Sequence, residues 1–277
     1  VYVRFGEPVS ALAILGGPGD ARSAGPEVRR LALKKLAFEV SCRINDSIPI
    51  TGSALLTLTL LGARGRSLTL PQIHAAIPGY LAFARLRRLP MAATAALDSD
   101  AAVVGVLDGL IAQGVARSHA AGKKAVYGIA PEQHLAAAYY RNTIVHYFLS
   151  SAIAELALLG AAEHALADRI AAFEAEALGI RDLLKFDFFF RDRARFVSSV
   201  VSEVETLAPD WRERLASGPD GVASMLRAAP MLCSDMMLRS FSEAHAVTAE
   251  VLASGEGADP FEESGFLDRC MGLGHQQ

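Results

Sequence analysis

The stretch Ala138-Tyr-Tyr-Arg-Asn-Thr-Ile-Val-His-Tyr-Phe148 places aromatic rings, a guanidinium, an amide and an imidazole in an otherwise apolar part of the chain. The residues around it predict a single buried helix from Glu132 to Leu159. Burying polar groups without partners costs about 1–3 kcal/mol each. Arg141, Asn142 and His146 therefore need partners inside the fold or a ligand.

The rest of the second half of the chain is also predicted to be helical, as far as about Leu252. Further helices are expected from Glu163 to Leu178 and from Arg181 to Leu207. The glycine-containing tail after Leu252 is expected to be loose and to end in one short helix.

The first residues alternate apolar Val1, Val3 and Phe5 with polar or aromatic neighbours, which predicts a short strand. A linker rich in glycine and proline follows at 16–26, and a helix is expected from about Glu27. One face of this helix should be buried, because its apolar residues recur at helical spacing. These residues are Leu33, Leu36, Ala37, Val40 and Ile44.

Between residues 50 and 130 the pattern predicts more helices and then a hairpin. A helix is expected over Gly52–Gly62, and a second begins at the capping box Thr69-Leu-Pro-Gln72 and is interrupted at Pro78-Gly79. Asp100 is expected to cap a third helix, which Gly114 ends. Residues 115–118 and 124–129 predict two strands joined by a turn at 121–122. Helices followed by a hairpin are the order of a winged-helix module.

The predicted fold class is therefore mainly α: a winged-helix-like module with a small β-hairpin, followed by a helical bundle, with a residual strand at the N-terminus. We expect three parts, with boundaries at 1–26, 27–131 and 132–277.

Composition and charge exclude several classes of protein. Hydrophobic residues make up 52% of the 277 residues, yet no uninterrupted apolar run is long enough to span a membrane. A net charge of −3, from 27 basic and 30 acidic residues, gives no general attraction to nucleic acid or anionic lipid. The three cysteines, Cys42, Cys233 and Cys270, are widely spaced and fit a reducing compartment.

Four short motifs occur in order along the chain, namely Val1-Tyr-Val-Arg-Phe-Gly-Glu-Pro8, Cys42-Arg-Ile-Asn45, Arg66-Ser-Leu-Thr69 and Tyr139-Tyr-Arg-Asn-Thr-Ile-Val-His146. Together they resemble the C-terminal part of bacterial membrane-associated glycerol-3-phosphate acyltransferases. The resemblance covers most of residues 1–200. It implies that the N-terminal strand is the end of an α/β acyltransferase domain.

The resemblance also implies a function for the intact protein. An enzyme of this family transfers a fatty acyl group from acyl-coenzyme A or acyl carrier protein to the sn-1 hydroxyl of glycerol 3-phosphate, the first step of phospholipid biosynthesis. Dihydroxyacetone-phosphate acyltransferases share this region, so the acceptor stays open. We expect a peripheral location at the cytoplasmic side of the cell membrane, with this segment supporting the catalytic domain or its membrane seating.

The family uses a His-x4-Asp pair, in which the histidine deprotonates the acceptor hydroxyl and the aspartate orients the imidazole. No histidine of this chain has aspartate five positions later. We therefore assign no catalytic residue, expect the chain alone to be inactive, and expect it to be the C-terminal part of a longer protein. The cysteines and histidines do not cluster at metal-ligand spacings, and no glycine-rich nucleotide loop or other sign of a cofactor is present.

Arg141, Asn142 and His146 are the candidate binding residues. On a continuous helix Asn142 and His146 would be neighbours one turn apart. Arg141 could contact a phosphate or an acidic residue of the catalytic domain, because its fork suits both. The alternative is a buried polar network that fastens this helix to its neighbours.

Two segments combine apolar and basic residues. Lys185-Phe-Asp-Phe-Phe-Phe190 precedes a run of arginines at 191–195, and Arg85, Arg87 and Arg88 lie beside Leu86. Either segment could contact a membrane interface or belong to the core and a solvated face.

A winged-helix DNA-binding regulator with a helical dimerisation region is the alternative function. The residues from Leu89 to Ala116 include no lysine or arginine, while Asp98, Asp100 and Asp108 lie on or beside the expected recognition helix. DNA phosphates would repel such a helix, so we expect no nucleic-acid partner.

Overall fold

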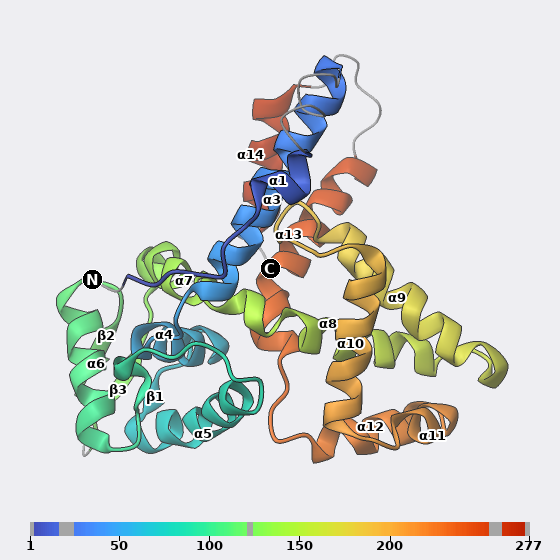
Figure 1. Cartoon of the computed structure of the whole chain (residues 1–277). Coiled ribbons are helices and arrows are strands. Elements are labelled where there is room, and N and C mark those ends of the chain that lie inside the picture. The colour runs from blue at the N-terminus through green and yellow to red at the C-terminus, as the bar shows by residue number, and fades with distance from the viewer. Residues whose placement is uncertain (1–2, 17–24, 121–123, 255–261, 275–277) are drawn as a thin grey trace.

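A computed structural model describes residues 3–16, 25–120, 124–254 and 262–274, and it is mainly helical with one small sheet, as predicted (Figure 1). The hydrophobic core runs through both halves of the chain, from Ile50 to Leu238. Among the described helices, none combines the length and the apolar character that crossing a membrane requires.

The N-terminal segment differs from its prediction. Val1 and Tyr2 lie outside the described residues, and residues 3–10 have no regular secondary structure. The expected strand is therefore wrong for residues 3–5, because a strand is stable only when neighbouring strands satisfy its backbone groups. A short helix, α1 (Ala11–Leu15), follows.

Helix α3 (Pro26–Ser47) begins with Pro26, one residue before the expected start at about Glu27, and proline is tolerated there because the first turn needs no N–H donor. Its expected buried face is exposed, however. The exposed fractions are 57% for Leu33, 39% for Val40 and 58% for Ile44, and Cys42 is the buried residue of this helix. The apolar pattern correctly predicted the helix but wrongly predicted that the rest of this chain would cover it.

A module of helices and a small sheet follows α3. Helix α4 (Gly52–Gly62) has the predicted bounds and is buried for most of its length. The predicted hairpin is present as β2 (Arg117–His119) and β3 (Val126–Gly128); its turn lies outside the described residues. A strand that the sequence did not reveal, β1 (Leu68–Thr69), pairs with the other side of β3.

Helix α5 (Leu70–Leu86) is continuous through Pro78, so the predicted interruption is wrong. Buried Ile77, Tyr80 and Leu81 hold the two sides of the proline against the core. Helix α6 (Asp100–Ala112) is capped by Ser99, whose side chain accepts from the backbone N–H of Ala102, and not by Asp100. The order of α4, β1, α5, α6, β2 and β3 is that of a winged-helix module, and this finer assignment stays a prediction.

The predicted helix over 132–159 is broken in two. Helix α7 (His134–Asn142) ends, a 3-10 turn occupies Val145–Tyr147, and α8 (Leu149–Ala162) begins anew. The Thr143 hydroxyl donates to the Tyr140 carbonyl at 2.7 Å, which gives the backbone a local alternative to a continued helix.

Helix α8 is the central helix of the second half. It packs against α9 (Arg169–Leu183), α10 (Arg193–Leu207) and α12 (Pro219–Ala228). The predicted helix from Arg181 is wrong at its start, because residues 184–192 form a connection. The remaining helices are α11 (Trp211–Ala216), α13 (Ser234–Ser254) and α14 (Glu263–Gly274), the last of which confirms the expected terminal helix.

Glu155 is a buried carboxylate on α8 that the surrounding backbone satisfies. Its oxygens accept from the N–H groups of Cys233 at 2.7 Å and Ser234 at 2.8 Å, at the start of α13. Burial raises the pKa of Glu155, although the two backbone donors partly counteract this effect. A carboxylate at a helix N-terminus satisfies otherwise unpaired donors and interacts favourably with the helix dipole.

Replacing Glu155 with alanine should lower the free energy of unfolding by about 1–3 kcal/mol, because two buried N–H groups lose their acceptors. Urea denaturation followed by circular dichroism measures this change. Glu163→Ala, at an exposed position after the same helix, should leave the midpoint nearly unchanged. Equal effects of the two substitutions would show that Glu155 does not anchor α13.

Candidate functional site

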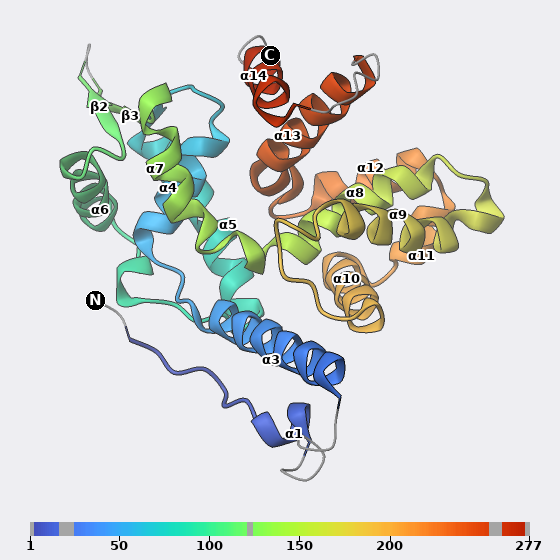
Figure 2. The same cartoon turned by 90° about the horizontal axis from the view of Figure 1, so that it is seen from above.

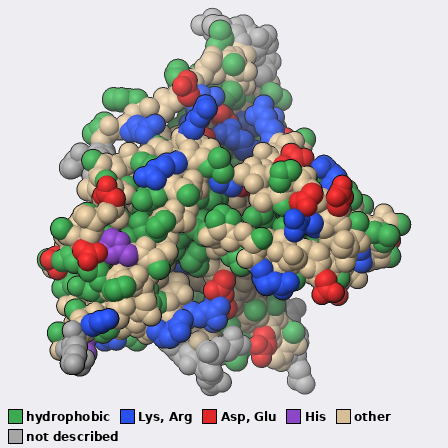
Figure 3. Space-filling model, turned by 90° about the horizontal axis from the view of Figure 1, so that it is seen from below, with side chains coloured by type: hydrophobic (Ala, Val, Ile, Leu, Met, Phe, Trp, Pro, Cys, Tyr) green, Lys and Arg blue, Asp and Glu red, His purple; other side chains and the backbone are tan. Residues whose placement is uncertain are grey.

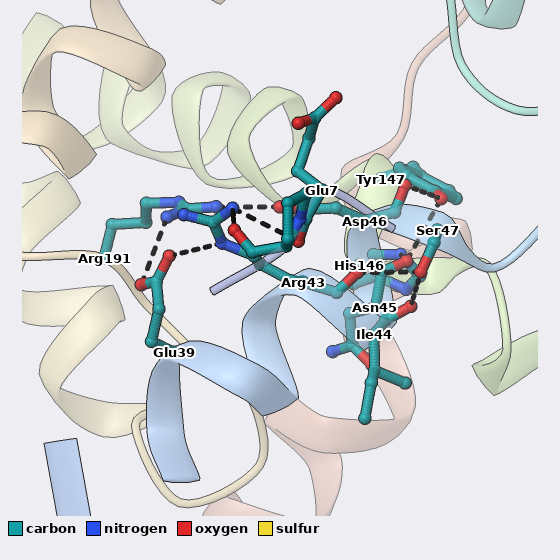
Figure 4. A network of polar contacts seen from close by, with 11 residues as sticks. Glu7, Glu39, Arg43, Ile44, Asn45, Asp46, Ser47, His146, Tyr147 and Arg191 are labelled. Atoms are coloured by element: carbon teal, nitrogen blue, oxygen red, sulfur yellow. Dashed lines mark hydrogen bonds and ion pairs between the residues drawn. The ribbon is translucent and has the colours of Figure 1, made fainter. Parts of the chain in front are cut away.

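The C-terminal half of α3 carries a polar network (Figure 4). The Arg43 Nη1 atom donates to the backbone carbonyls of Glu7 at 3.2 Å and Pro8 at 2.9 Å, and its Nε donates to Glu39 at 2.9 Å. This hydrogen bond from Arg43 lowers the pKa of the Glu39 carboxyl. Arg43 thereby fastens the N-terminal segment to α3.

Arg191 extends the network from the connection between α9 and α10. Its Nη2 atom donates to Asp46 at 2.7 Å, and its Nη1 lies 3.7 Å from the Glu39 carboxylate. The connection after α9 is thus held against the last turns of α3 by charged contacts.

Two side chains of the 145–147 turn bind the end of α3. His146 Nε2 lies 2.9 Å from the Asn45 carbonyl oxygen. The Tyr147 hydroxyl lies 2.7 Å from the Ile48 carbonyl oxygen and 3.1 Å from that of Asn45. The last carbonyl groups of a helix have no i+4 partner. The Asn45 carbonyl also accepts from the Ile48 N–H at 3.1 Å, so His146 adds a second donor there, whereas Tyr147 supplies a donor to the Ile48 carbonyl.

The protonation states follow from this environment. Burial lowers the pKa of His146, so its neutral form is favoured and the Nε2–H donates to the carbonyl. Burial also raises the pKa of Tyr147 above its ordinary value, which keeps the hydroxyl a donor. His146 thus binds the backbone, and among the described residues no carboxylate is hydrogen-bonded to its ring as in a catalytic His–Asp pair.

Arg141 and Asn142 form a separate pair. Arg141 is buried, and its Nε and Nη2 atoms donate to Asn142 Oδ1 at 3.0 and 2.9 Å. Its guanidinium carbon lies 5.9 Å from the centre of the Phe241 ring on α13, and burial lowers its pKa. Asn142 is exposed, and the break after α7 separates it from the turn that holds His146. The predicted one-turn relation between Asn142 and His146 is therefore wrong; a binding role for the three residues stays a prediction.

A cavity of about 250 Å³ lies beside His146. Its lining includes Asn45 and Cys42 from α3, Arg191, and Ser199 from α10. Burial raises the pKa of the Cys42 thiol, which disfavours the nucleophilic thiolate. The cavity therefore offers hydrogen-bonding groups, charges of both signs and a thiol that is not activated.

The fold also brings together two histidine–aspartate pairs whose members lie far apart in the sequence, so the His-x4-Asp spacing does not reveal them. His74 Nε2 lies 2.8 Å from Asp100, linking α5 to α6, and His245 Nε2 lies 3.1 Å from Asp187, linking α13 to the connection after α9. Each pair joins separate elements near the surface. Within the described ranges, no three histidine, cysteine, aspartate or glutamate side chains come together as ligands for a metal ion.

Three of the four motifs thus meet in space. The first supplies the carbonyls that Arg43 binds, the second lies at the end of α3, and the fourth supplies His146. The Arg66–Thr69 motif lies apart, where Thr69 N–H donates to Gln72 and begins α5. Motifs distant in the chain therefore share one structural site.

Comparisons with known proteins identify the family of the chain. The family described as the C-terminal region of glycerol-3-phosphate acyltransferase matches residues 1–277, and the chain belongs to this family. Relatives named "Putative acyltransferase plsB1", from Mycobacterium bovis and Mycobacterium tuberculosis, are 36% identical over 278 aligned residues. The alignment covers 99% of this chain and 44% of each relative, so the chain spans less than half of their length. No solved structure matches the chain.

Stability should depend on pH through His146. The unfolded state has the ordinary histidine pKa near 6.5, and the folded state has a lower one. Between these two pKa values the unfolded state binds more protons than the folded state. The contribution of the neutral, buried His146 to the free energy of unfolding is therefore complete above pH 6.5 and is lost as the pH falls through the folded-state pKa. His146→Gln should reduce the fall in unfolding free energy between pH 7 and pH 5, measured in urea. The exposed His134→Gln should not, and an equal effect of both would exclude this origin.

Replacing Arg43 with methionine should free residues 3–9 from α3, because both backbone carbonyls lose their donor. Chymotrypsin should then cleave after Phe5 about tenfold faster, since proteases need a locally released segment. Mass spectrometry of the fragments gives the rate. Arg30→Met removes only the ion pair with Glu27 on the same helix and should leave the rate unchanged. An unchanged cleavage rate in Arg43→Met would show that Arg43 does not hold the N-terminal segment against α3.

Proposed function

We propose that the chain is the C-terminal part of an enzyme that moves a fatty acyl group from a thioester to the sn-1 hydroxyl of glycerol 3-phosphate. The observation that carries this proposal is the family match over residues 1–277, supported by the meeting of three family motifs at one end of α3. The acyl donor, coenzyme A or acyl carrier protein, and the acceptor would bind the part of the enzyme that this chain does not span.

The chain would contribute support and not proton transfer. No histidine is followed five positions later by aspartate, and His146 binds a backbone carbonyl. Arg141 could still reach an acidic group or phosphate of the catalytic part only after leaving its burial beside Asn142, which favours a structural role for this guanidinium.

The chain alone should therefore have no acyltransferase activity. Loss of general base catalysis alone costs a factor of about 10²–10⁴, and loss of substrate positioning costs more. The test incubates the purified chain, and separately the longer protein, with glycerol 3-phosphate or dihydroxyacetone phosphate and a labelled acyl thioester. Only the longer protein should form the monoacyl product. Turnover by the chain above spontaneous thioester loss would reveal catalytic groups within it.

We also propose that the connection after α9 helps to seat the enzyme on the cytoplasmic face of a membrane. Phe188 and Phe190 pack inward, whereas Phe186 is 90% exposed and Phe189 is 50% exposed. The Phe189 ring contacts the exposed Phe38 ring of α3 at 5.6 Å between centres. Exposed aromatic rings beside Lys185 fit the boundary between headgroups and acyl chains. The second basic segment favours a membrane less, because Arg87 is mostly buried and paired with Glu203.

The purified chain should bind anionic vesicles weakly and should be released by high salt. Changing both Phe186 and Phe189 to serine should weaken this binding about tenfold, because each ring loses an apolar contact. Co-sedimentation over a range of lipid concentrations measures the change. Leu166→Ser, at an exposed position after α8, serves as the control. Binding that resists alkaline carbonate would instead indicate insertion.

The DNA-binding alternative is less well supported. Asp100 and Asp108 are exposed on α6, the helix that would enter the major groove. On the face seen from below, hydrophobic side chains lie among basic and acidic ones, and neither sign of charge dominates that face (Figure 3). A helix with outward carboxylates lacks the cations that phosphate contacts require.

A further inference from the structure

The apolar face of α3 is the largest disagreement between the sequence pattern and the fold. We define the α3 stripe as Leu33, Leu36, Ala37, Val40 and Ile44. These residues lie within about 100° of one another around the helix axis. Four are exposed and Leu36 is half-buried. Lys34, Lys35 and Glu39 lie outside this arc, and Arg43 lies at its border. Soluble proteins rarely leave such a contiguous patch uncovered, so it marks an interaction surface.

The N-terminal segment extends this surface. Phe5 is 92% exposed and Val3 is 77% exposed. Arg43 holds the following backbone, at Glu7 and Pro8, against α3. A hollow of about 360 Å³ lies between the two, and its lining includes Phe5, Val40 and Ile44. Residues 4–9 and the C-terminal end of the α3 stripe therefore face each other across one open groove, whose lining mixes apolar side chains with Arg4, Glu7 and Arg43.

The groove lies on the outer side of the molecule. Figure 2 shows α3 between the N-terminal segment with α1 on one side and the remaining helices on the other. Helix α1 covers a different side of α3, since the lining shared by the two helices includes Ile14, Lys35 and Phe38 but no member of the stripe. No described element of this chain buries the stripe.

We propose that the groove is the seat of the catalytic part of the longer enzyme, which packs an apolar surface against the α3 stripe and residues 3–9. This inference rests on the proposed function. The chain spans 44% of its relatives, so more than half of such a protein is available to cover the groove. Arg43 holds Glu7 and Pro8 against α3, so a domain continuous with this segment would start near the Val40 and Ile44 end of the stripe.

Cysteine labelling tests this surface in both the chain and the longer protein. Each carries Cys270→Ser, which leaves the buried Cys42 and Cys233 as a slow background. Ile44→Cys places a thiol in the stripe, and Leu166→Cys places one at an exposed position after α8. A maleimide probe should modify Ile44→Cys rapidly in the chain and at least about tenfold more slowly in the longer protein. Leu166→Cys should react equally in both.

Other labelling results would show that something else covers the α3 stripe. Equal labelling of Ile44→Cys in the two proteins would overturn the inference. Protection already present in the chain alone, rising with concentration, would mean that a second copy covers the stripe, and protection only with anionic vesicles would mean that lipid does. Each of these results overturns the assignment. Acyl transfer by the longer protein, assayed in parallel, separates failure of this inference from failure of the proposed function.

Discussion

The end of α3 is bonded by side chains that lie 99 to 101 positions later in the chain. The carbonyl oxygen of Asn45 accepts from His146, 101 residues later, and that of Ile48 accepts from Tyr147. These contacts involve a 3-10 turn at Val145–Tyr147, and this turn interrupts the helix between α7 and α8. The same contacts therefore tie the end of α3 to the turn between α7 and α8. Neutral imidazole and neutral phenol are the states that such a buried cap requires, and burial favours both.

Local signals in the sequence predicted local structure well. Gly52–Gly62 has a threonine cap before an apolar run, and the hairpin strands flank a turn signal, so short-range chemistry determined both elements. The failures have long-range causes. Strand β1 is two residues long and exists because β3 offers it a partner. The break after Asn142 follows from partners on α3, which periodicity does not contain. Continuity of α5 through Pro78 likewise reflects burial on both sides.

In the candidate site, too, the sequence indicated the residue types, whereas their partners depend on long-range contacts. The sequence singled out Arg141, Asn142 and His146 as polar groups in an apolar context, and the structure places only His146 in contact with the other motifs. Arg43 became important through its contacts with Glu7 and Pro8, 36 and 35 residues earlier. The α3 stripe was recognised as apolar, but its exposure could not be read from a pattern that also fits a core helix. Helix α3 thus has a polar side that binds this chain and an apolar side that this chain leaves open.

The proposed function requires that the proton-transfer groups of the acyltransferase lie in the part of the enzyme that this chain does not span. Sequencing the DNA that precedes the Val1 codon tests it most directly. The account predicts an open reading frame that continues in frame and encodes a His-x4-Asp motif within an α/β pattern of strands and helices. A frame that starts at Val1, with no such motif encoded in frame upstream, would contradict it.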